Sequence, residues 1–226
     1  MTEYEIYSYD AFKFKTEDEL RTNNRIDESL LDSIQVDGFI AKAVSVKPNL
    51  VNMDKKTLMT MSGLIDKNGL PTVCGIMLFG KYPQYLSPNL DIVAVVCATK
   101  NYAEESESGE RFIVNKRLDG TIPQMLESGL AFVQQNIAKS TVIDNTGHRN
   151  DVSEYPVKAI REIILNALIH RDYSIHTEND PIRIEIYPDR IEISNPGGLY
   201  GRLSIDDLGK IKADVRNPFI AAALEI

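Results

Sequence analysis

Tryptophan is absent from the 226-residue sequence, and only two cysteines and three histidines occur. Cys74 and Cys97 each lie in an apolar stretch, where a buried reduced thiol is the ordinary state, so no disulfide framework is expected. The histidines are His148, His170 and His176, and their spacing, with no cysteine nearby, matches no common zinc pattern. A metal held by protein ligands alone is therefore not expected.

Long apolar runs and an excess of basic residues are also missing. No run approaches the roughly 20 apolar residues of a membrane helix, and no signal peptide opens the chain, so we expect a soluble cytoplasmic protein without a membrane partner. Asp and Glu outnumber Lys and Arg by 33 to 25, and the net charge of −8 gives no overall field that attracts a polyanion. Direct DNA binding by residues 30–70 stays open only as a weak alternative that depends on Lys55 and Lys56.

The sequence instead contains alternating helical and extended patterns, which predict a mixed α/β (α+β) fold. Its apolar content of 43% is enough to bury a core. We expect an extended arm or connector over residues 1–50, although residues 28–44 have a helical pattern, and a central α/β portion over 51–145. The periodicities predict strands at 72–80, 90–99 and 111–118, helices at 121–140 and 156–171, a β-hairpin over 181–194 and a helical end after 215.

Two motifs are similar to phosphate-handling sites but lack a required residue. Gly75 to Tyr82 nearly fits the phosphate loop G-x-x-x-x-G-K-[ST], but Tyr82 occupies the position of the small hydroxyl that holds magnesium. The residues His170 to Asp172 read HRD, as in a kinase catalytic loop, but Thr177 stands where that loop has asparagine. Both interpretations are rejected.

The helix at 156–171 has a narrow polar stripe on an otherwise apolar surface. Glu162, Asn166 and His170 are spaced by four residues, so their side chains lie in one line along the helix. Polar groups held against apolar surface need partners, and one explanation is that the stripe braces neighbouring loops. The functional explanation is that the carboxylate orients a water molecule while the amide oxygen binds a hard cation such as Mg²⁺.

The stripe resembles the N-box of the GHKL ATPase superfamily, which includes gyrase B and the histidine kinases. The resemblance implies that Asn166 holds the Mg²⁺ of bound ATP, that Glu162 is the general base of ATP hydrolysis, and that His170 lies in the nucleotide site. It also implies that residues 150–226 form an incomplete GHKL (Bergerat-type) α/β sandwich, truncated before the second glycine box.

The turn at 194–198, which reads SNPGG, would correspond to the Asp-x-Gly turn that receives adenine in this superfamily. The matching residues are Asn195, Pro196 and Gly197, followed by Gly198. The resemblance therefore places the base near Asn195, Gly197 and Gly198, with an amide in place of the usual carboxylate. Taken alone, Asn-Pro-Gly-Gly is also an ordinary tight turn.

Three stretches together resemble one bacterial and archaeal group, the RecG-related predicted transcriptional regulators: 154–174, 189–201 and 215–219. Proteins of this group carry a Schlafen/AlbA-type DNA-binding domain at the N-terminus, so DNA is an expected partner through a domain absent from this chain. No helicase motor motif is visible, and strand unwinding is not implied. ATP with Mg²⁺ is the expected cofactor, bound weakly or not at all by this portion, and ATP hydrolysis is expected only of the full-length protein.

A second interpretation is a nucleotide-free, degenerate scaffold that acts as a dimerisation or effector-sensing module. Asn195 in place of aspartate favours this alternative, whereas Glu162 and Asn166 together favour nucleotide binding. The sequence is compatible with a homo-oligomer but does not fix the oligomeric state.

Overall fold

The computed structural model describes residues 17–23, 25–137, 139–143, 149–201, 205–207 and 214–225, and also residues 3, 6, 10 and 210. The helices are α2 (Ser33–Val46), α3 (Lys55–Met61), α4 (Val73–Phe79), α5 (Ile122–Asn136), α6 (Val157–His170) and α7 (Pro218–Leu224). The strands are β1 (Ile92–Cys97), β2 (Phe112–Leu118), β3 (Lys139–Ile143), β4 (Arg149–Ser153), β5 (Ile182–Ile186) and β6 (Ile191–Ser194).

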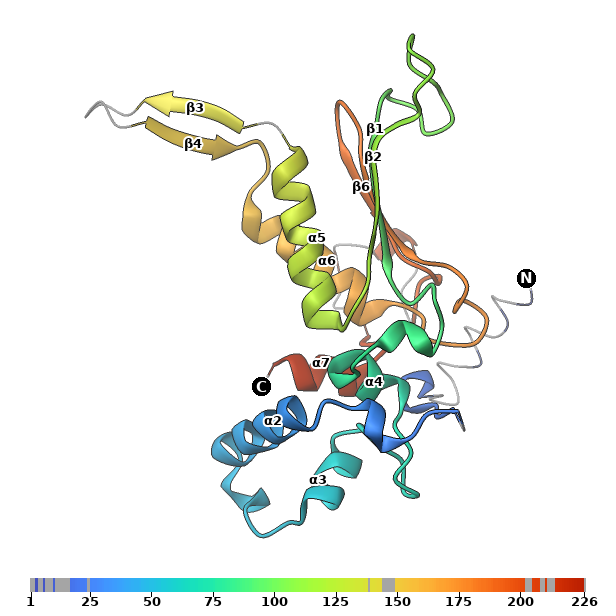
Figure 1. The fold of residues 1–226 in the computed structure, drawn as a ribbon, viewed down its shortest axis with the longest axis vertical. Helices are drawn as coiled ribbons and strands as arrows, with labels where there is room; N and C mark the ends of the chain where they lie inside the picture. Colours follow the sequence, from blue (N-terminus) through green and yellow to red (C-terminus); the bar gives the residue numbers. More distant parts are fainter. Residues whose placement is uncertain are drawn as a thin grey trace.

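A four-stranded mixed sheet is the centre of the upper half of the molecule (Figure 1). Its strand order is β2-β1-β5-β6, in which β1 and β5 are parallel and the two outer pairs are antiparallel. The sheet therefore joins two strands from residues 90–118 with the hairpin of residues 181–194. The predicted mixed α/β fold class and the predicted strands at 90–99 and 111–118 are confirmed, as is the hairpin.

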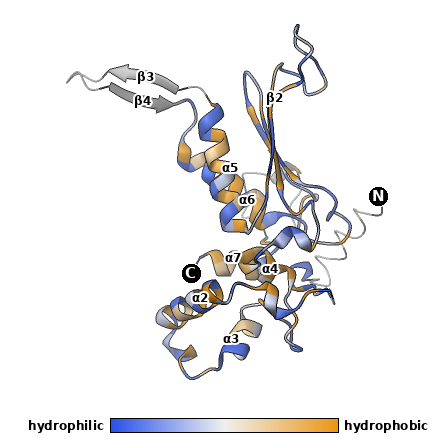
Figure 2. Ribbon diagram, in the orientation of Figure 1, coloured by the Kyte–Doolittle hydropathy of each residue, from blue (hydrophilic) through white to orange (hydrophobic). Residues whose placement is uncertain are grey.

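Helices α5 and α6 lie side by side on one face of this sheet (Figure 1). The parallel register pairs Ala94 with Ile184, and both side chains are fully buried on this face. Gly129 of α5 faces the same core, because a Cβ atom there would be in van der Waals contact with Ile184 of β5 at 3.4 Å and with Ile164 of α6 at 3.5 Å. Hydrophobic residues recur along both helices and along the strands of the sheet (Figure 2).

The lower half of the molecule contains α2, α3, α4 and α7 (Figure 1). Helix α2 begins at an N-cap, Asp32, whose carboxylate accepts hydrogen bonds from the amides of Ile34 and Gln35. The one-turn 3₁₀ segment Asp18–Leu20 contacts α4. None of the described helices is long and apolar enough to cross a membrane.

The predicted strand at 72–80 is wrong, because these residues form helix α4. The hydroxyl of Thr72 accepts a hydrogen bond from the Gly75 amide at 3.0 Å, which is the N-cap interaction that starts a helix. Six of the seven residues of α4 are buried, so the segment shows no polar face. A short helix buried on all sides has the same apolar pattern as a buried strand, and its periodicity does not separate the two.

Candidate functional site

The polar stripe lies on α6, as predicted, and its first two residues are exposed. Ile164 and Leu168 turn to the core, while Glu162 and Asn166 face outward. The Asn166 Nδ2 atom donates to Glu162 Oε1 at 3.3 Å, which leaves the amide oxygen of Asn166 available to another group. His170, the last residue of α6, is half-buried, and its pKa is lowered by burial and by the positive charge of Arg216.

The SNPGG turn lies against the C-terminal end of α6. The Asn195 Nδ2 atom is 3.5 Å from the carbonyl oxygen of Ala167, and the Asp172 amide donates to the carbonyl of Pro196 at 3.2 Å. Gly197 adopts a φ of +109°, a left-handed conformation that favours glycine, so the turn needs this residue. The structure thus brings Asn195 and Gly197 next to the turn of α6 that follows Asn166.

Arg216 joins this turn to the HRD segment, and the local sequence patterns gave no sign of that role. Its Nη1 atom forms an ion pair with Asp172 Oδ2 at 2.9 Å, and the two side chains are 8% and 2% exposed. Its Nη2 atom donates to the carbonyl of Gly198 at 3.0 Å, and its guanidinium lies over the Tyr200 ring at 4.8 Å. Arg216 therefore ties Gly198, at the end of the turn, to Asp172 of the HRD segment. The only indication in the sequence was that Arg216 lies in the stretch 215–219, which resembles the RecG-related group.

Asn217 closes the C-terminal end of α6. Its Nδ2 atom donates to the carbonyls of Ile169 and Arg171, at 2.6 and 2.7 Å. Carbonyl groups at a helix end lack intrahelical partners, and a side-chain amide that bonds two of them fixes the chain at that point. Asp172, beside it, accepts a hydrogen bond from the amide of Ser174 at 2.8 Å, so the HRD segment is a structured turn at the helix end.

The donor set of the stripe fits a metal that enters with a ligand better than a metal bound by protein alone. In the part of the chain that the structure describes, no group of three or more His, Cys, Asp or Glu side chains gathers as a metal site would require. One amide oxygen at Asn166 and one carboxylate at Glu162 are available, which suits Mg²⁺, since this ion keeps several waters and is commonly bound through phosphates.

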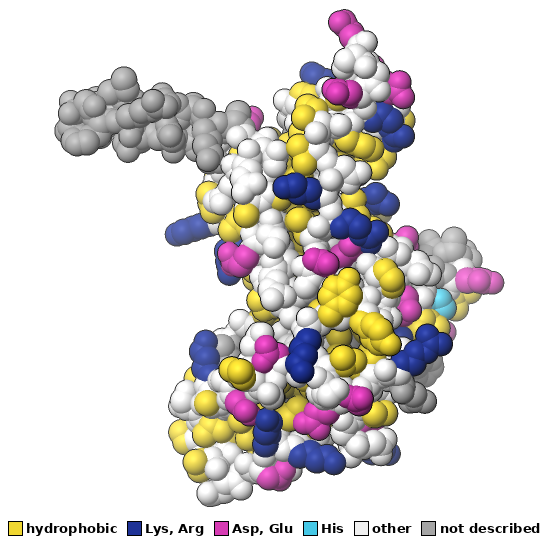
Figure 3. Space-filling model, viewed as in Figure 1, with side chains coloured by type: hydrophobic (Ala, Val, Ile, Leu, Met, Phe, Trp, Pro, Cys, Tyr) yellow, Lys and Arg dark blue, Asp and Glu magenta, His cyan; other side chains and the backbone are white. Residues whose placement is uncertain are grey.

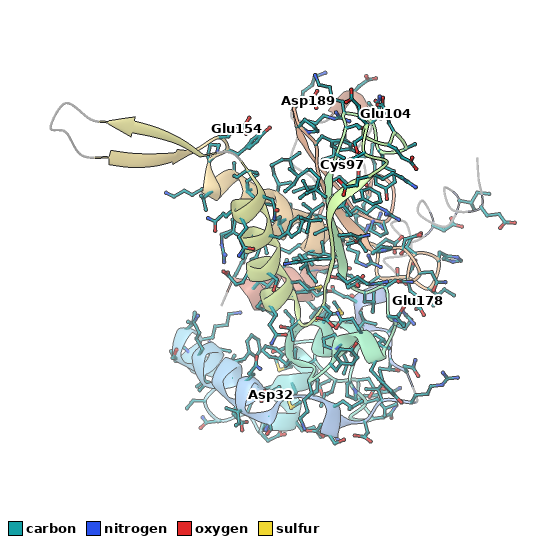
Figure 4. The ribbon with its side chains drawn as sticks, turned by 45° about the horizontal axis from the view of Figure 1, so that its top comes forward. Asp32, Cys97, Glu104, Glu154, Glu178 and Asp189 are labelled. Atoms are coloured by element: carbon teal, nitrogen blue, oxygen red, sulfur yellow. The ribbon has the colours of Figure 1, made fainter. Side chains whose placement is uncertain are left out.

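Two cavities lie away from the stripe. One, of about 310 Å³, is at the end of the sheet beside Cys97 and Tyr187, and Asp189 and Glu154 also line it (Figure 4). The other, of about 240 Å³, lies between α2, α3 and α7. Residues of the stripe and of the SNPGG turn line neither one.

Charges of both signs are interspersed over the face of the molecule in Figure 3. Over α2 and α3, where DNA binding was a weak alternative, the Lys55 ammonium pairs with the Asp37 carboxylate at 2.7 Å. That pairing neutralises one of the two lysines on which the alternative depends.

The C-terminal part of the chain matches a known family. Residues 179–226 match the HATPase_c_4 model, described as "Putative ATP-dependent DNA helicase recG C-terminal". The match supports a RecG-related, ATPase-like, nucleotide-binding region there. It contains the hairpin, the SNPGG turn and Arg216, and it begins after Glu162 and Asn166.

A solved structure shares the fold over nearly the whole chain. The DIP2311 protein from Corynebacterium diphtheriae superposes with a TM-score of 0.62 at 18% identity, over 98% of this chain and 41% of that one. The chain thus spans less than half the length of that relative, and at this identity the likeness concerns the fold alone. No curated protein matches the sequence.

Proposed function

We propose that the chain supplies the GHKL-type nucleotide-binding portion of a DNA-linked transcriptional regulator related to the RecG group. The observation that carries the proposal is the meeting of three segments distant in sequence at the C-terminal end of α6. The HRD segment, the SNPGG turn and the Arg216–Asn217 pair are joined there by polar contacts, of which the Arg216–Asp172 ion pair is buried, one helical turn from Asn166. The family match over residues 179–226 supports the nucleotide-binding class.

In this proposal, the side-chain orientations assign the roles. Asn166 directs its Nδ2 atom to Glu162, so its Oδ1 atom is the ligand for the Mg²⁺ of ATP. The exposed Glu162 carboxylate orients the water that attacks the terminal phosphate in the longer protein. Asn195 directs its Nδ2 atom to the carbonyl of Ala167, which leaves Oδ1 to accept a hydrogen bond from the amino group of adenine. Gly197 and Gly198 let the base approach the backbone, with His170 at the edge of the site. The longer protein reaches DNA through an N-terminal domain.

Titration of isotope-labelled residues 1–226 with Mg²⁺-ATP at millimolar concentration, followed by NMR, tests the site even if binding is weak. We expect the side-chain amide signals of Asn166 and Asn195 to shift together. Asn166→Ala should weaken binding at least about tenfold, because the metal loses its protein ligand, and Glu162→Gln should leave affinity nearly unchanged.

The matched control is Asn115→Ala, an exposed asparagine on β2. This variant should bind as the wild type does. ATP binding that is indifferent to Asn166→Ala, or shifts confined to the cavity near Cys97, would show that the nucleotide site is elsewhere.

A second candidate function, a nucleotide-free dimerisation module, is favoured by apolar side chains near the stripe. Ile163 is 48% exposed, Leu199 43% and Val215 42%. Ile163 follows Glu162 on α6, Leu199 follows the SNPGG turn and Val215 precedes Arg216, and exposed apolar surface is typical of an interface. If the labelled chain shows no shift with Mg²⁺-ATP but sediments as a dimer that Ile163→Glu dissociates, this function replaces the first.

A further inference from the structure

Glu19 is a fully buried carboxylate that links the two ends of the chain. It lies in the one-turn segment Asp18–Leu20 and is 0% exposed. Its Oε1 atom accepts a hydrogen bond from the amide of Phe219 at 2.9 Å, and its Oε2 atom accepts one from the amide of Ile220 at 2.8 Å. These amides belong to the first turn of α7, where backbone N–H groups lack helical partners. A side chain 200 residues away therefore caps α7.

The segment that Glu19 holds is the one that fixes the candidate site. Arg216 and Asn217 immediately precede α7, and they bond to Asp172, to Gly198 and to the end of α6, as described above. Since Phe219 follows Asn217 by only two residues, a shift of the start of α7 must displace these side chains. The hydrogen bonds of Glu19 to described residues go to Phe219 and Ile220 and not to the stripe or the turn, so its effect on them is transmitted through residues 216–220.

The same N-terminal segment also contacts the HRD side of the site through Arg21. The Arg21 Nη2 atom forms an ion pair with Glu178 Oε2 at 2.8 Å and donates to the carbonyl of Tyr173 at 3.3 Å. Glu178 lies where the lower end of the sheet meets the lower helices (Figure 4). The carbonyl of Arg21 accepts from the amide of Val73 at 2.9 Å, which anchors the segment to α4.

We propose that Glu19 is a positioning residue of the candidate site: the N-terminal segment, through Glu19, holds residues 216–220 against the end of α6, and its release loosens the SNPGG turn. The positioning of the turn stands on the described contacts, whereas its effect on nucleotide affinity rests on the proposed function.

The surroundings of Glu19 make this contact sensitive to pH. Burial raises the pKa of Glu19 from 4.5 to about 7, and the negative charge of Glu17 adds to the rise, while the two amide hydrogen bonds oppose it. The other titratable groups nearby, among the described residues, are Cys74 on α4, Tyr173 after α6 and Tyr200 after the turn, with Asp18 and Arg21 on the segment of Glu19 itself.

A raised pKa means that the closed contact binds a proton more tightly than the released segment does. The contribution of Glu19 to the contact is therefore fully present below pH 4.5 and is lost as pH rises to about 7 and beyond. Above that range the buried carboxylate is ionised, and release is easiest.

Hydrogen exchange at the Phe219 and Ile220 amides, corrected for intrinsic rates, tests the proposal in Glu19→Gln, Glu19→Ala and the exposed control Glu28→Gln, whose charge is not among those that shift the pKa of Glu19. Wild type and control should lose protection from about pH 5 to about pH 8, whereas Glu19→Gln should show a flat profile. Glu19→Ala should exchange about tenfold faster and shift the Asn195 and Asn217 amide signals, because the cap is gone. If Glu19→Ala does not fold, the pH profile of Glu19→Gln decides.

The proposal would be overturned if Glu19→Ala left the exchange rate of the Ile220 amide unchanged, or if Glu19→Gln had the same pH profile as the wild type. Faster exchange at α7 with no movement of the Asn195 signal would also overturn it, since the contact would then be only structural. The nucleotide site is judged separately: if no variant binds Mg²⁺-ATP while the exchange results hold, the proposed function fails and the positioning of the turn by Glu19 stands.

Discussion

Gly75→Ala is expected to lower the free energy of unfolding by about 3 kcal/mol or more. Gly75 lies inside the buried helix α4, and a Cβ atom there would be 2.1 Å from the carbonyl oxygen of Leu64 and 2.9 Å from its carbonyl carbon. Both are backbone atoms, so no flexible side chain can move aside, and α4 must shift away from residue 64. Urea unfolding followed by circular dichroism gives the free energy directly.

The matched control is Gly38→Ala in α2, where an added Cβ meets no atom within 4 Å. Alanine inside a helix is more favourable than glycine by about 0.5–1 kcal/mol, so this variant should be as stable as the wild type or slightly more so. If Gly75→Ala unfolds at the wild-type urea concentration, the close packing of α4 on residue 64 is wrong. The prediction also explains why a near phosphate-loop pattern begins at this glycine: Gly75 is required by packing.

The elements that could be predicted from sequence are those with one buried face. Along β5 the buried Ile182, Ile184 and Ile186 alternate with more exposed residues, and in α6 the buried positions recur every three to four residues. These periods, 2 and 3.6, are visible in a single sequence because half of each element faces solvent. Helix α4 lacks such a face, and its secondary structure depended on the Thr72 cap and on contacts with residues far along the chain.

The same distinction applies to the candidate site. The Glu162–Asn166 line could be predicted because residues four apart on a helix are neighbours. The contacts that hold the site together could not. Arg216 meets Asp172 from 44 positions away, and Glu19 meets Phe219 from 200 positions away. Such pairs are adjacent only after the sheet and helices have packed, so no local spacing encodes them. The N-terminal segment, expected to be part of a connector, therefore proved to contain a cap for α7.

The second large effect is expected at the Asp172–Arg216 ion pair, where Arg216→Ala should cost about 3–5 kcal/mol of stability. Both side chains are almost fully buried, so the substitution removes the guanidinium that neutralises a buried carboxylate. Asp172→Asn should cost less, because its Oδ1 atom can still accept from the Ser174 amide. A double-mutant cycle measured by urea unfolding should give a coupling free energy above about 1 kcal/mol, since the two residues contact directly.

The exposed pair Lys55–Asp37 is the control, because it has a similar 2.7 Å contact but its side chains are 46% and 62% exposed. Lys55→Ala should cost less than about 1 kcal/mol, since solvent screens the exposed charges. An Arg216→Ala variant no less stable than Lys55→Ala would contradict the buried pair. Because Arg216 also donates to Gly198, its loss should shift the NMR signals of Asn195 and Gly197, whereas Lys55→Ala should leave both in place. That difference connects stability to the candidate site, because the Arg216 side chain that pairs with Asp172 at the end of α6 also bonds Gly198 in the turn proposed to receive the base.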